Sequence, residues 1–134
     1  GSTLWLVGSL GFVQHDKYLK RAGMDYLERA EICHVDDWAA VVAARPGWQP
    51  YFFSSKGRHS HFDITYPPQS LLVFGSETHG LPNAFLAAMA DKTVRIPMAP
   101  QGRSINLASS VAIILYDALK QNTPVPCYAE QVNP

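Results

Sequence analysis

Short apolar runs alternate with segments of helical periodicity along most of the chain. The runs are rich in β-branched and aromatic residues and are bounded by Gly, Pro or polar residues, which is typical of strands. The predicted strands are 3–7, 31–35, 51–55, 71–74 and 93–96, and the predicted helices are 15–26, 38–44, 82–90 and 105–121. Strands that alternate with helices predict an α/β fold with a largely parallel sheet. The run 71–74 is wholly apolar, as expected of a strand covered on both faces.

The length and composition fit one small domain. The chain has 134 residues, of which 47% are apolar, enough for a core without disulfide or metal staples. We therefore expect a single domain over residues 1–121, followed by an irregular tail over 122–134. The longest helical apolar stretch is broken by Ser109, Ser110 and Asp117, which excludes a membrane-spanning helix there.

Charge and cysteine content narrow the class of protein further. Eleven Lys and Arg balance eleven Asp and Glu, which excludes a simple polycation, so any nucleic-acid site must be a local patch. Cys33 and Cys127 lie far apart and suit a reducing cytoplasm better than a disulfide scaffold. His59 and His61 are spaced i, i+2, a pair that is more often at the surface than a metal site, so we expect them at the surface and predict no metal site.

Ligands of open parallel sheets bind beyond the carboxyl ends of the strands. Three predicted loops leave strands there: 54–59, 75–82 and 97–104. Gly75 and Gly80 bound a polar turn in the second loop, which would admit a ligand close to the backbone or would simply make a tight connection. Ser76, Glu77 and His79 are too close in sequence to converge as a hydrolase triad.

The combination of these loops carries a family resemblance. Two segments closely resemble motifs two and three of the SPOUT class of RNA methyltransferases: FGSETHGLP at 74–82 and IPMAPQGRSINLASSVAIILYDALKQ at 96–121. A third segment, LGFVQHDKYLKRAGMDY at 10–26, is similar to one typical of the branch that methylates the ribose 2′-hydroxyl of the tRNA wobble nucleotide, a cytidine or uridine. The resemblance covers about residues 3–121.

The resemblance implies a parallel-sheet α/β-knot with a deep C-terminal trefoil knot, a homodimer, and S-adenosylmethionine held bent in the knotted loops. Knots are nearly absent from other proteins, so sequence physics would not propose one. The residues at the family's cofactor positions are Phe53, Gly75, Ile96 and Ser104, with Met98 and Leu107 as neighbours. Glycine admits the backbone closely, and the apolar side chains can cover adenine.

The resemblance also implies roles in catalysis and RNA binding. Glu77, Ser104 and Asn106 match active-site positions, and Glu77 either organises its loop for the reaction or merely satisfies loop amides. His79 has no expected role in proton transfer. The residues expected to face the partner, the anticodon stem-loop of tRNA, are Lys17, Lys20, Arg21, Lys56, Arg58 and Arg103. A solvated charged surface is the alternative for the lysines and arginines.

Two departures from the family pattern bear on activity. Ala108 stands where the family often has a serine, and the chain begins at what resembles the family's second strand. We therefore expect the family's first strand and the helix that carries motif one to be missing. The asparagine and arginine of motif one, which the family is proposed to use at the acceptor ribose, would then be missing as well. Two alternatives stay open: a ribosomal-RNA ribose methyltransferase, and a catalytically impaired module that binds cofactor or RNA.

Overall fold

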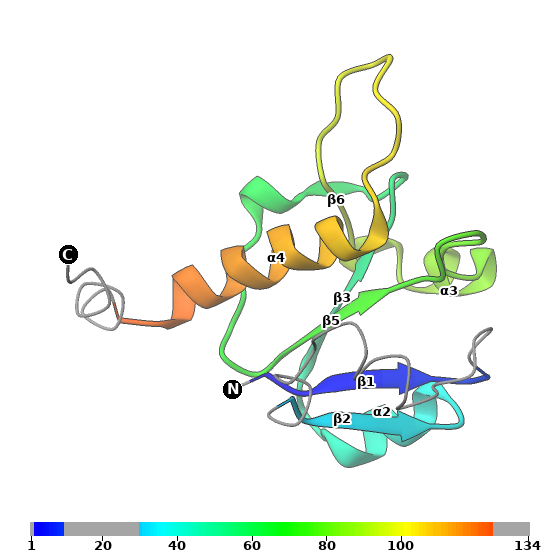
Figure 1. Cartoon of the computed structure of the whole chain (residues 1–134), viewed down its shortest axis with the longest axis vertical. Coiled ribbons are helices and arrows are strands. Elements are labelled where there is room, and N and C mark those ends of the chain that lie inside the picture. Colours follow the sequence, from blue (N-terminus) through cyan, green and yellow to red (C-terminus); the bar gives the residue numbers. More distant parts are fainter. Residues whose placement is uncertain (1, 10–29, 125–134) are drawn as a thin grey trace, which may run out of the picture. The chain divides into compact units, whose positions relative to one another are not determined.

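The computed structural model describes residues 2–9 and 30–124 (Figure 1). The chain divides after Pro46 into two compact units, 1–46 and 47–134. The prediction of one domain over 1–121 stays a prediction. The predicted helix 15–26 and nearly all of the predicted tail lie outside the described residues.

The described part of the first unit is a parallel strand pair with one helix. Strand β1 (Leu4–Val7) pairs in register with β2 (Ile32–Val35). Helix α2 (Trp38–Ala44) follows, and its first turn is capped by the Asp37 carboxylate, which accepts a 2.9 Å hydrogen bond from the Ala40 amide. Helix α2 ends at the Arg45 C-cap, directly before Pro46, as the sequence predicts.

The second unit is built on a four-stranded sheet in the order β4-β6-β3-β5, in which every pair is parallel (Figure 1). Its strands are β3 (Gln49–Phe53), β4 (His59–Ser60), β5 (Ser70–Phe74) and β6 (Thr93–Arg95). The predicted parallel α/β fold is therefore confirmed. Because all four strands run the same way, their carboxyl ends share one edge of the sheet.

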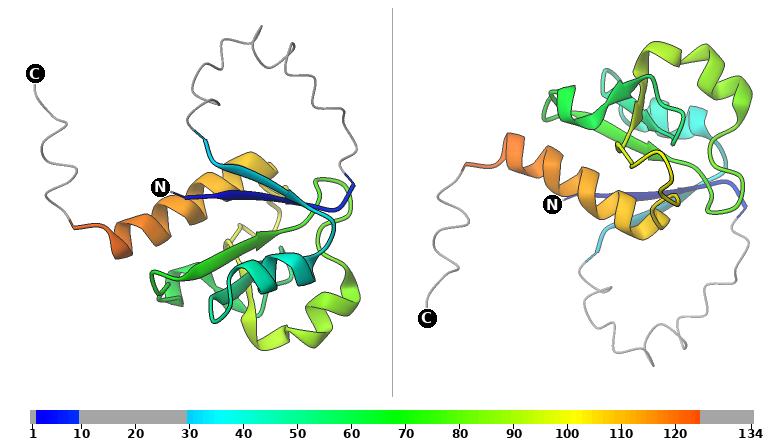
Figure 2. Two further views of the ribbon diagram at one scale, coloured as in Figure 1. Left: turned by 90° about the horizontal axis from the view of Figure 1, so that it is seen from below. Right: turned by 90° about the horizontal axis from the view of Figure 1, so that it is seen from above.

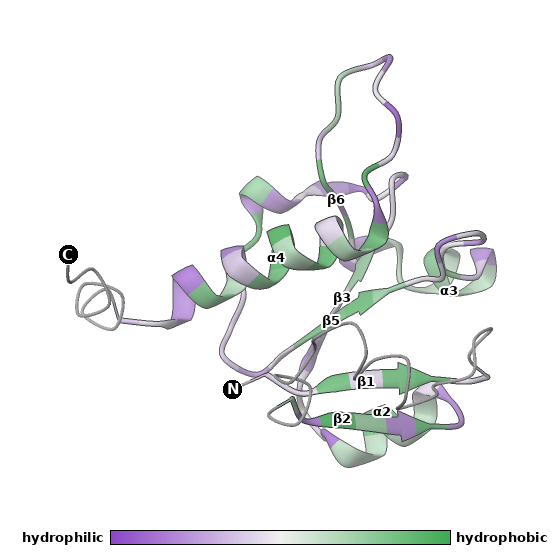
Figure 3. Ribbon diagram, viewed as in Figure 1, coloured by the Kyte–Doolittle hydropathy of each residue, from purple (hydrophilic) through white to green (hydrophobic). Residues whose placement is uncertain are grey.

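Helices cover both faces of this sheet (Figure 2). The side chains of neighbouring residues in a strand point to opposite faces of the sheet, so Phe52 and Phe53 pack on opposite faces. Phe52 meets Phe85 of helix α3 (Asn83–Ala88) edge to face at 5.0 Å between ring centroids. Phe53 lies in the core with Val94 and with Ile114 of helix α4 (Leu107–Asn122), whose hydrophobic and hydrophilic residues are marked in Figure 3.

Strand β3 begins and ends two residues earlier than predicted, and it includes Pro50. Proline has no amide hydrogen to donate. It is tolerated there because β6 pairs only with Phe52 and Phe53, so no ladder hydrogen bond to β6 is lost at Pro50. The Ser54 amide still donates a 3.0 Å hydrogen bond to the Val94 carbonyl of β6, and the strand ends there because the chain turns, with the Gly57 amide donating to the Ser54 carbonyl at 2.9 Å. Strand β4 was not predicted, since two polar residues in a basic segment give no apolar run.

A polar cluster ties the 3-10 helix η2 (His61–Asp63) and the residues after it to α4. The His61 ring lies 3.1 Å from the Asp117 carboxylate and is only 6% exposed, so the expectation of a surface His61 is wrong. The Gln121 side chain accepts from the Tyr66 amide at 2.9 Å and donates to the Ile64 carbonyl at 3.2 Å. The segment 61–66 is thereby fixed against the helix.

We expect Tyr66→Phe to stabilise the protein. The Tyr66 hydroxyl is buried, and no hydrogen-bond partner for it lies among the described residues, so its removal relieves a cost of about 1 kcal/mol. Burial, with Asp117 and Tyr51 nearby, raises the pKa of Tyr66 well above its usual range. Above about pH 10 the unfolded state therefore releases a proton that the native state keeps, and wild-type stability falls as pH rises.

Urea unfolding of the wild type and of Tyr66→Phe, at pH 7 and at pH 10.5, tests both points. The variant should have the larger free energy of unfolding at pH 7, and the difference from the wild type should be greater at pH 10.5. A less stable variant at pH 7 would show that the hydroxyl has a partner.

No helix in the described ranges 2–9 and 30–124 is long and apolar enough to cross a membrane.

Candidate functional site

Three loops meet at the carboxyl edge of the second unit's sheet. Residues 54–58 follow β3, residues 75–82 follow β5, and residues 96–106 follow β6 and stand away from the sheet, shown in yellow in Figure 1. The strands β6, β3 and β5 are neighbours in that order, so the loops lie next to one another. The sequence predicted this edge as the ligand-binding edge.

The loop after β5 closes on itself. Ser76 and Gly80 form an antiparallel bridge, in which the Gly80 amide donates to the Ser76 carbonyl at 2.9 Å. Gly80 has a φ of +65°, which favours glycine. A Cβ on Gly75 would overlap the backbone of Gly80 and Leu81. The space beside Gly75 is thus filled by the loop's own backbone rather than left open for a ligand.

Ser76 has a structural role that the sequence analysis did not predict. Its hydroxyl accepts a 3.1 Å hydrogen bond from the His79 amide, so Ser76 organises the turn. The signal was a serine at the start of a turn, where its hydroxyl can bond to the backbone that follows. Glu77 is exposed, and none of the described residues forms a hydrogen bond or ion pair with its carboxylate. The structure therefore gives the organising role to Ser76.

The loop after β3 is held against β6. Gly57 is buried, and a Cβ there would overlap the backbone of Val94 and Arg95. The Gly57 amide donates to the Ser54 carbonyl at 2.9 Å, which makes a tight turn. The sequence predicted a loop at 54–59, and the structure shows a turn fixed by backbone contacts there, with His59 already in β4.

The apolar residues predicted to contact a cofactor differ in exposure. Phe53 is 8% exposed and stacks on Phe74 at 4.7 Å, so its ring belongs to the core. Ile96 is half-buried against the core, and Leu107 is half-buried at the start of α4. Met98 is 43% exposed. Ile96, Met98 and Leu107 thus provide apolar surface at this edge.

Asn106 has a structural role that the sequence did not predict. Its side-chain oxygen caps α4 by accepting hydrogen bonds from the Ala108 amide at 2.9 Å and the Ser109 amide at 3.4 Å. This orientation leaves the NH₂ group as the part of the side chain that could meet a substrate. Ser104 and Arg103 are exposed on the same loop, before Asn106.

The predicted RNA-facing residues fall into three groups. Lys17, Lys20 and Arg21 lie outside the described residues. Lys56 and Arg103 are exposed. Arg58 forms a 2.7 Å ion pair with Asp91, and both side chains are well exposed. An exposed pair of this kind is weak, so Arg58 could exchange Asp91 for a phosphate at little cost.

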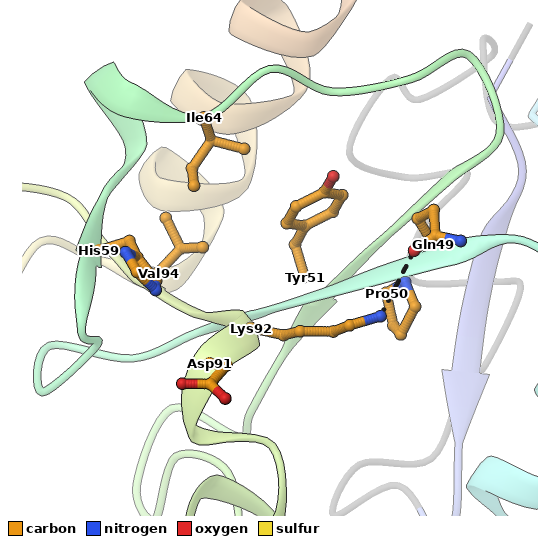
Figure 4. Close-up of a pocket in the computed structure, with 8 residues that line it drawn as sticks. All are labelled: Gln49, Pro50, Tyr51, His59, Ile64, Asp91, Lys92 and Val94. Carbon is orange, nitrogen blue, oxygen red and sulfur yellow. Dashed lines mark hydrogen bonds between the residues drawn. The ribbon is translucent and has the colours of Figure 1, made fainter.

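A separate small pocket lies at the opposite, amino edge of the sheet (Figure 4). Its volume is about 60 Å³, and Lys92 crosses it to donate a 3.3 Å hydrogen bond to Gln49. Ligand pockets usually exceed about 300 Å³. The pocket is too small for a nucleoside and is not the candidate site. In the described part of the chain, no three His, Cys, Asp or Glu residues gather as metal ligands.

Comparison with known proteins identifies the class. The model of the SpoU rRNA methylase family matches residues 1–116, so the chain belongs to that family of RNA-methylating enzymes. The resemblance to RNA methyltransferases noted in motifs two and three is thereby confirmed.

Individual relatives are more specific. The chain is 41% identical to a tRNA (cytidine(34)-2′-O)-methyltransferase from Methylovorus glucosotrophus, over 91% of this chain and 80% of the relative. A solved structure described in terms of 2-OH methylation of C/U34 on tRNA is 37% identical, with a TM-score of 0.81 over 90% of this chain and 79% of that one. An AdoMet-bound rRNA methyltransferase from Sinorhizobium meliloti is 27% identical, with a TM-score of 0.75 over 92% of this chain and 47% of that one.

Proposed function

We propose that this protein transfers a methyl group from S-adenosylmethionine to the ribose 2′-hydroxyl of the wobble nucleotide, cytidine or uridine 34, of tRNA. The observation that carries the proposal is the 41% identity, over 91% of this chain, to a tRNA (cytidine(34)-2′-O)-methyltransferase. The segment 10–26, which resembles the tRNA branch, supports the same substrate. A tRNA substrate places the reaction in the cytoplasm.

The residues at the carboxyl edge fit the cofactor. Ile96, Met98 and Leu107 give apolar cover for an adenine ring, and the turn at 75–81, which is closed by its own backbone, lies at the same edge of the sheet. Ser104 adds an exposed hydroxyl on the third loop. Phe53 supports this surface from the core beneath it, since its ring stacks on Phe74.

The cofactor supplies a methyl group that its sulfonium already activates, so the task of the chain is chiefly to align the ribose hydroxyl with it. Asn106 at the start of α4 and Ser104 on the loop before it would hydrogen-bond the ribose. The Glu77 carboxylate is exposed at the same edge and available to accept the hydroxyl proton. Arg103 and Lys56 would meet the flanking phosphates.

The finer features of the family belong to the same proposal. The loops 75–82 and 96–106 would thread as a trefoil knot, and two copies of the chain would form a homodimer that joins their basic residues around the anticodon stem-loop. Exposed apolar residues on α4, Ile113 and Tyr116, are consistent with such pairing. Sedimentation should then give twice the chain mass of 14.8 kDa.

Methyl transfer to tRNA from cells that lack wobble methylation tests the function. We expect label from the cofactor to enter a single nucleotide, position 34, of tRNAs with cytidine or uridine there. A tRNA of the same sequence with 2′-deoxyribose at position 34 is the matched control and should take up none. Labelling of the deoxy control would exclude ribose methylation, and labelling of ribosomal RNA in place of tRNA would favour the alternative substrate.

We expect Lys56 to contribute more to tRNA affinity than Arg58. Lys56 is exposed, whereas Arg58 is paired with Asp91. Lys56→Ala should weaken binding roughly threefold to tenfold and reduce the salt dependence by about one released ion. Arg58→Ala should weaken binding less, because Arg58 is already paired with Asp91.

Salt titrations of tRNA affinity measure these effects. Lys92→Ala is the matched control, since Lys92 is an exposed lysine at the opposite edge of the sheet. Equal losses for Lys92→Ala and Lys56→Ala would show a diffuse charge effect instead of a defined RNA-facing surface.

A further inference from the structure

Arg95 lies at the carboxyl end of β6, and its side chain crosses to the loop that follows β3. One guanidinium nitrogen, Nη1, donates to two successive carbonyls, Gly57 at 2.9 Å and Arg58 at 2.8 Å. Hydrogen bonds from a charged donor are stronger than those between neutral groups. A single side chain of β6 therefore holds two peptide groups of the neighbouring loop.

The rest of β6 bonds to the same loop. The Val94 carbonyl accepts from the Ser54 amide at 3.0 Å, and the Thr93 hydroxyl accepts from the Arg58 amide at 3.0 Å. Because Gly57 has no side chain, its backbone can lie directly against the backbone of Val94 and Arg95. Arg95 thus completes a set of contacts that fix residues 54–58 against β6.

Arg95 also stands directly before the third loop. Ile96, the next residue, begins the 96–106 loop, which carries Met98 and Ser104. Movement of Arg95 would change the spacing between the first loop and the third. Preorganised binding surfaces lose less free energy on binding than surfaces that must be ordered by the ligand.

We propose that Arg95 is a positioning residue for the cofactor: it holds the 54–58 loop, which directly follows Phe53, at a fixed distance from the 96–106 loop, which carries the cofactor-facing residues Met98 and Ser104. This inference rests on the proposed function, since it takes the edge at which the two loops meet to be the cofactor site. Arg95 itself is half-buried and lies outside the core cluster of Phe53, Tyr66, Val94, Ile114 and Ala118.

The test compares Arg95→Met with Arg95→Lys. Methionine keeps the apolar stem and removes all donors, whereas lysine keeps the charge and a point donor that cannot reproduce the planar guanidinium. Lys92→Met is the matched control, because it removes one positive charge just before the same strand, at the other edge of the sheet. Each variant is measured for amide exchange by NMR, for S-adenosylmethionine affinity by calorimetry, and for methyl-transfer kinetics.

In Arg95→Met we expect the Gly57 and Arg58 amides to exchange at least about tenfold faster, the factor that one lost charge-assisted hydrogen bond represents, while β5 amides are unchanged. Cofactor affinity should fall about tenfold. The KM for the cofactor should rise with kcat at saturation within about twofold, since only binding is affected. Arg95→Lys should be intermediate, and Lys92→Met should match the wild type.

Faster loop exchange with unchanged cofactor affinity would overturn the inference, and so would weaker affinity with unchanged loop exchange. If Arg95→Met unfolds, the same comparison is made with Arg95→Lys, where equal exchange and affinity to the wild type would also overturn it. Failure of the proposed function is distinguishable, because the wild type itself would then bind no S-adenosylmethionine.

Discussion

Replacing Gly75 by valine will weaken S-adenosylmethionine binding more than about 100-fold, because the side chain has no room and the backbone conflict costs about 3 kcal/mol or more. A Cβ at this position would overlap the backbone of Gly80 and Leu81, which no change of rotamer can relieve. The substitution therefore opens the turn at 75–81 rather than simply filling a cofactor space. Calorimetry with the cofactor measures the loss.

Amide exchange distinguishes this opening from direct obstruction. The Gly80 and His79 amides, which donate to Ser76, should exchange faster in Gly75→Val even without cofactor. The matched control is Gly47→Ala. Gly47 has a left-handed φ of +79° with open space around it, so alanine there should cost about 1 kcal/mol of stability through strain while cofactor affinity stays within about twofold. Wild-type affinity in a folded Gly75→Val would refute the loop's part in binding.

The framework of the fold could be predicted because it depends on local apolar pattern. The wholly apolar run at 71–74 indicated a strand covered on both faces, and β5 is such a strand, extended by Ser70. The helix within motif three was likewise predicted from its periodicity, although α4 begins at Leu107 and not at 105, because Asn106 provides the cap. Pattern gives the elements, and capping and turn contacts determine where they end.

The candidate site could be predicted only as a set of loops at one edge. Arg95 was invisible in sequence because its partners are backbone carbonyls of residues 57 and 58, which carry no sequence signal. The sequence left open whether the glycines at 75 and 80 admit a ligand or make a tight connection, since it shows that a side chain is missing but not what occupies its place, which at Gly75 is the backbone of Gly80 and Leu81. The contact between the buried His61 ring and the Asp117 carboxylate was not predicted, because the two residues are 56 positions apart in the sequence.

We expect the two ends of the Asn106 side-chain amide to have different roles, one in capping α4 and the other in the reaction. Its oxygen caps α4, and its NH₂ group is the donor available to the ribose. Asn106→Asp keeps the capping oxygen, since Asp and Asn cap helices about equally well, but removes the donor. Asn106→Ser keeps a capping oxygen without adding charge. Asn106→Ala removes both functions.

Asn106→Asp should therefore keep wild-type stability while kcat for tRNA methylation falls about 100-fold, the effect of losing one well-placed donor in the transition state. Asn106→Ser should lose activity similarly, because its hydroxyl donor lies on a shorter side chain than the Asn106 NH₂ group. This variant therefore separates the loss of a well-placed donor from the added charge. Asn106→Ala should lose activity and also about 1 kcal/mol of stability, because α4 loses its cap. Thermal unfolding and kcat at saturating tRNA measure the two roles separately. Full activity in a stable Asn106→Asp would restrict Asn106 to capping and leave Ser104 and Glu77 to act on the ribose.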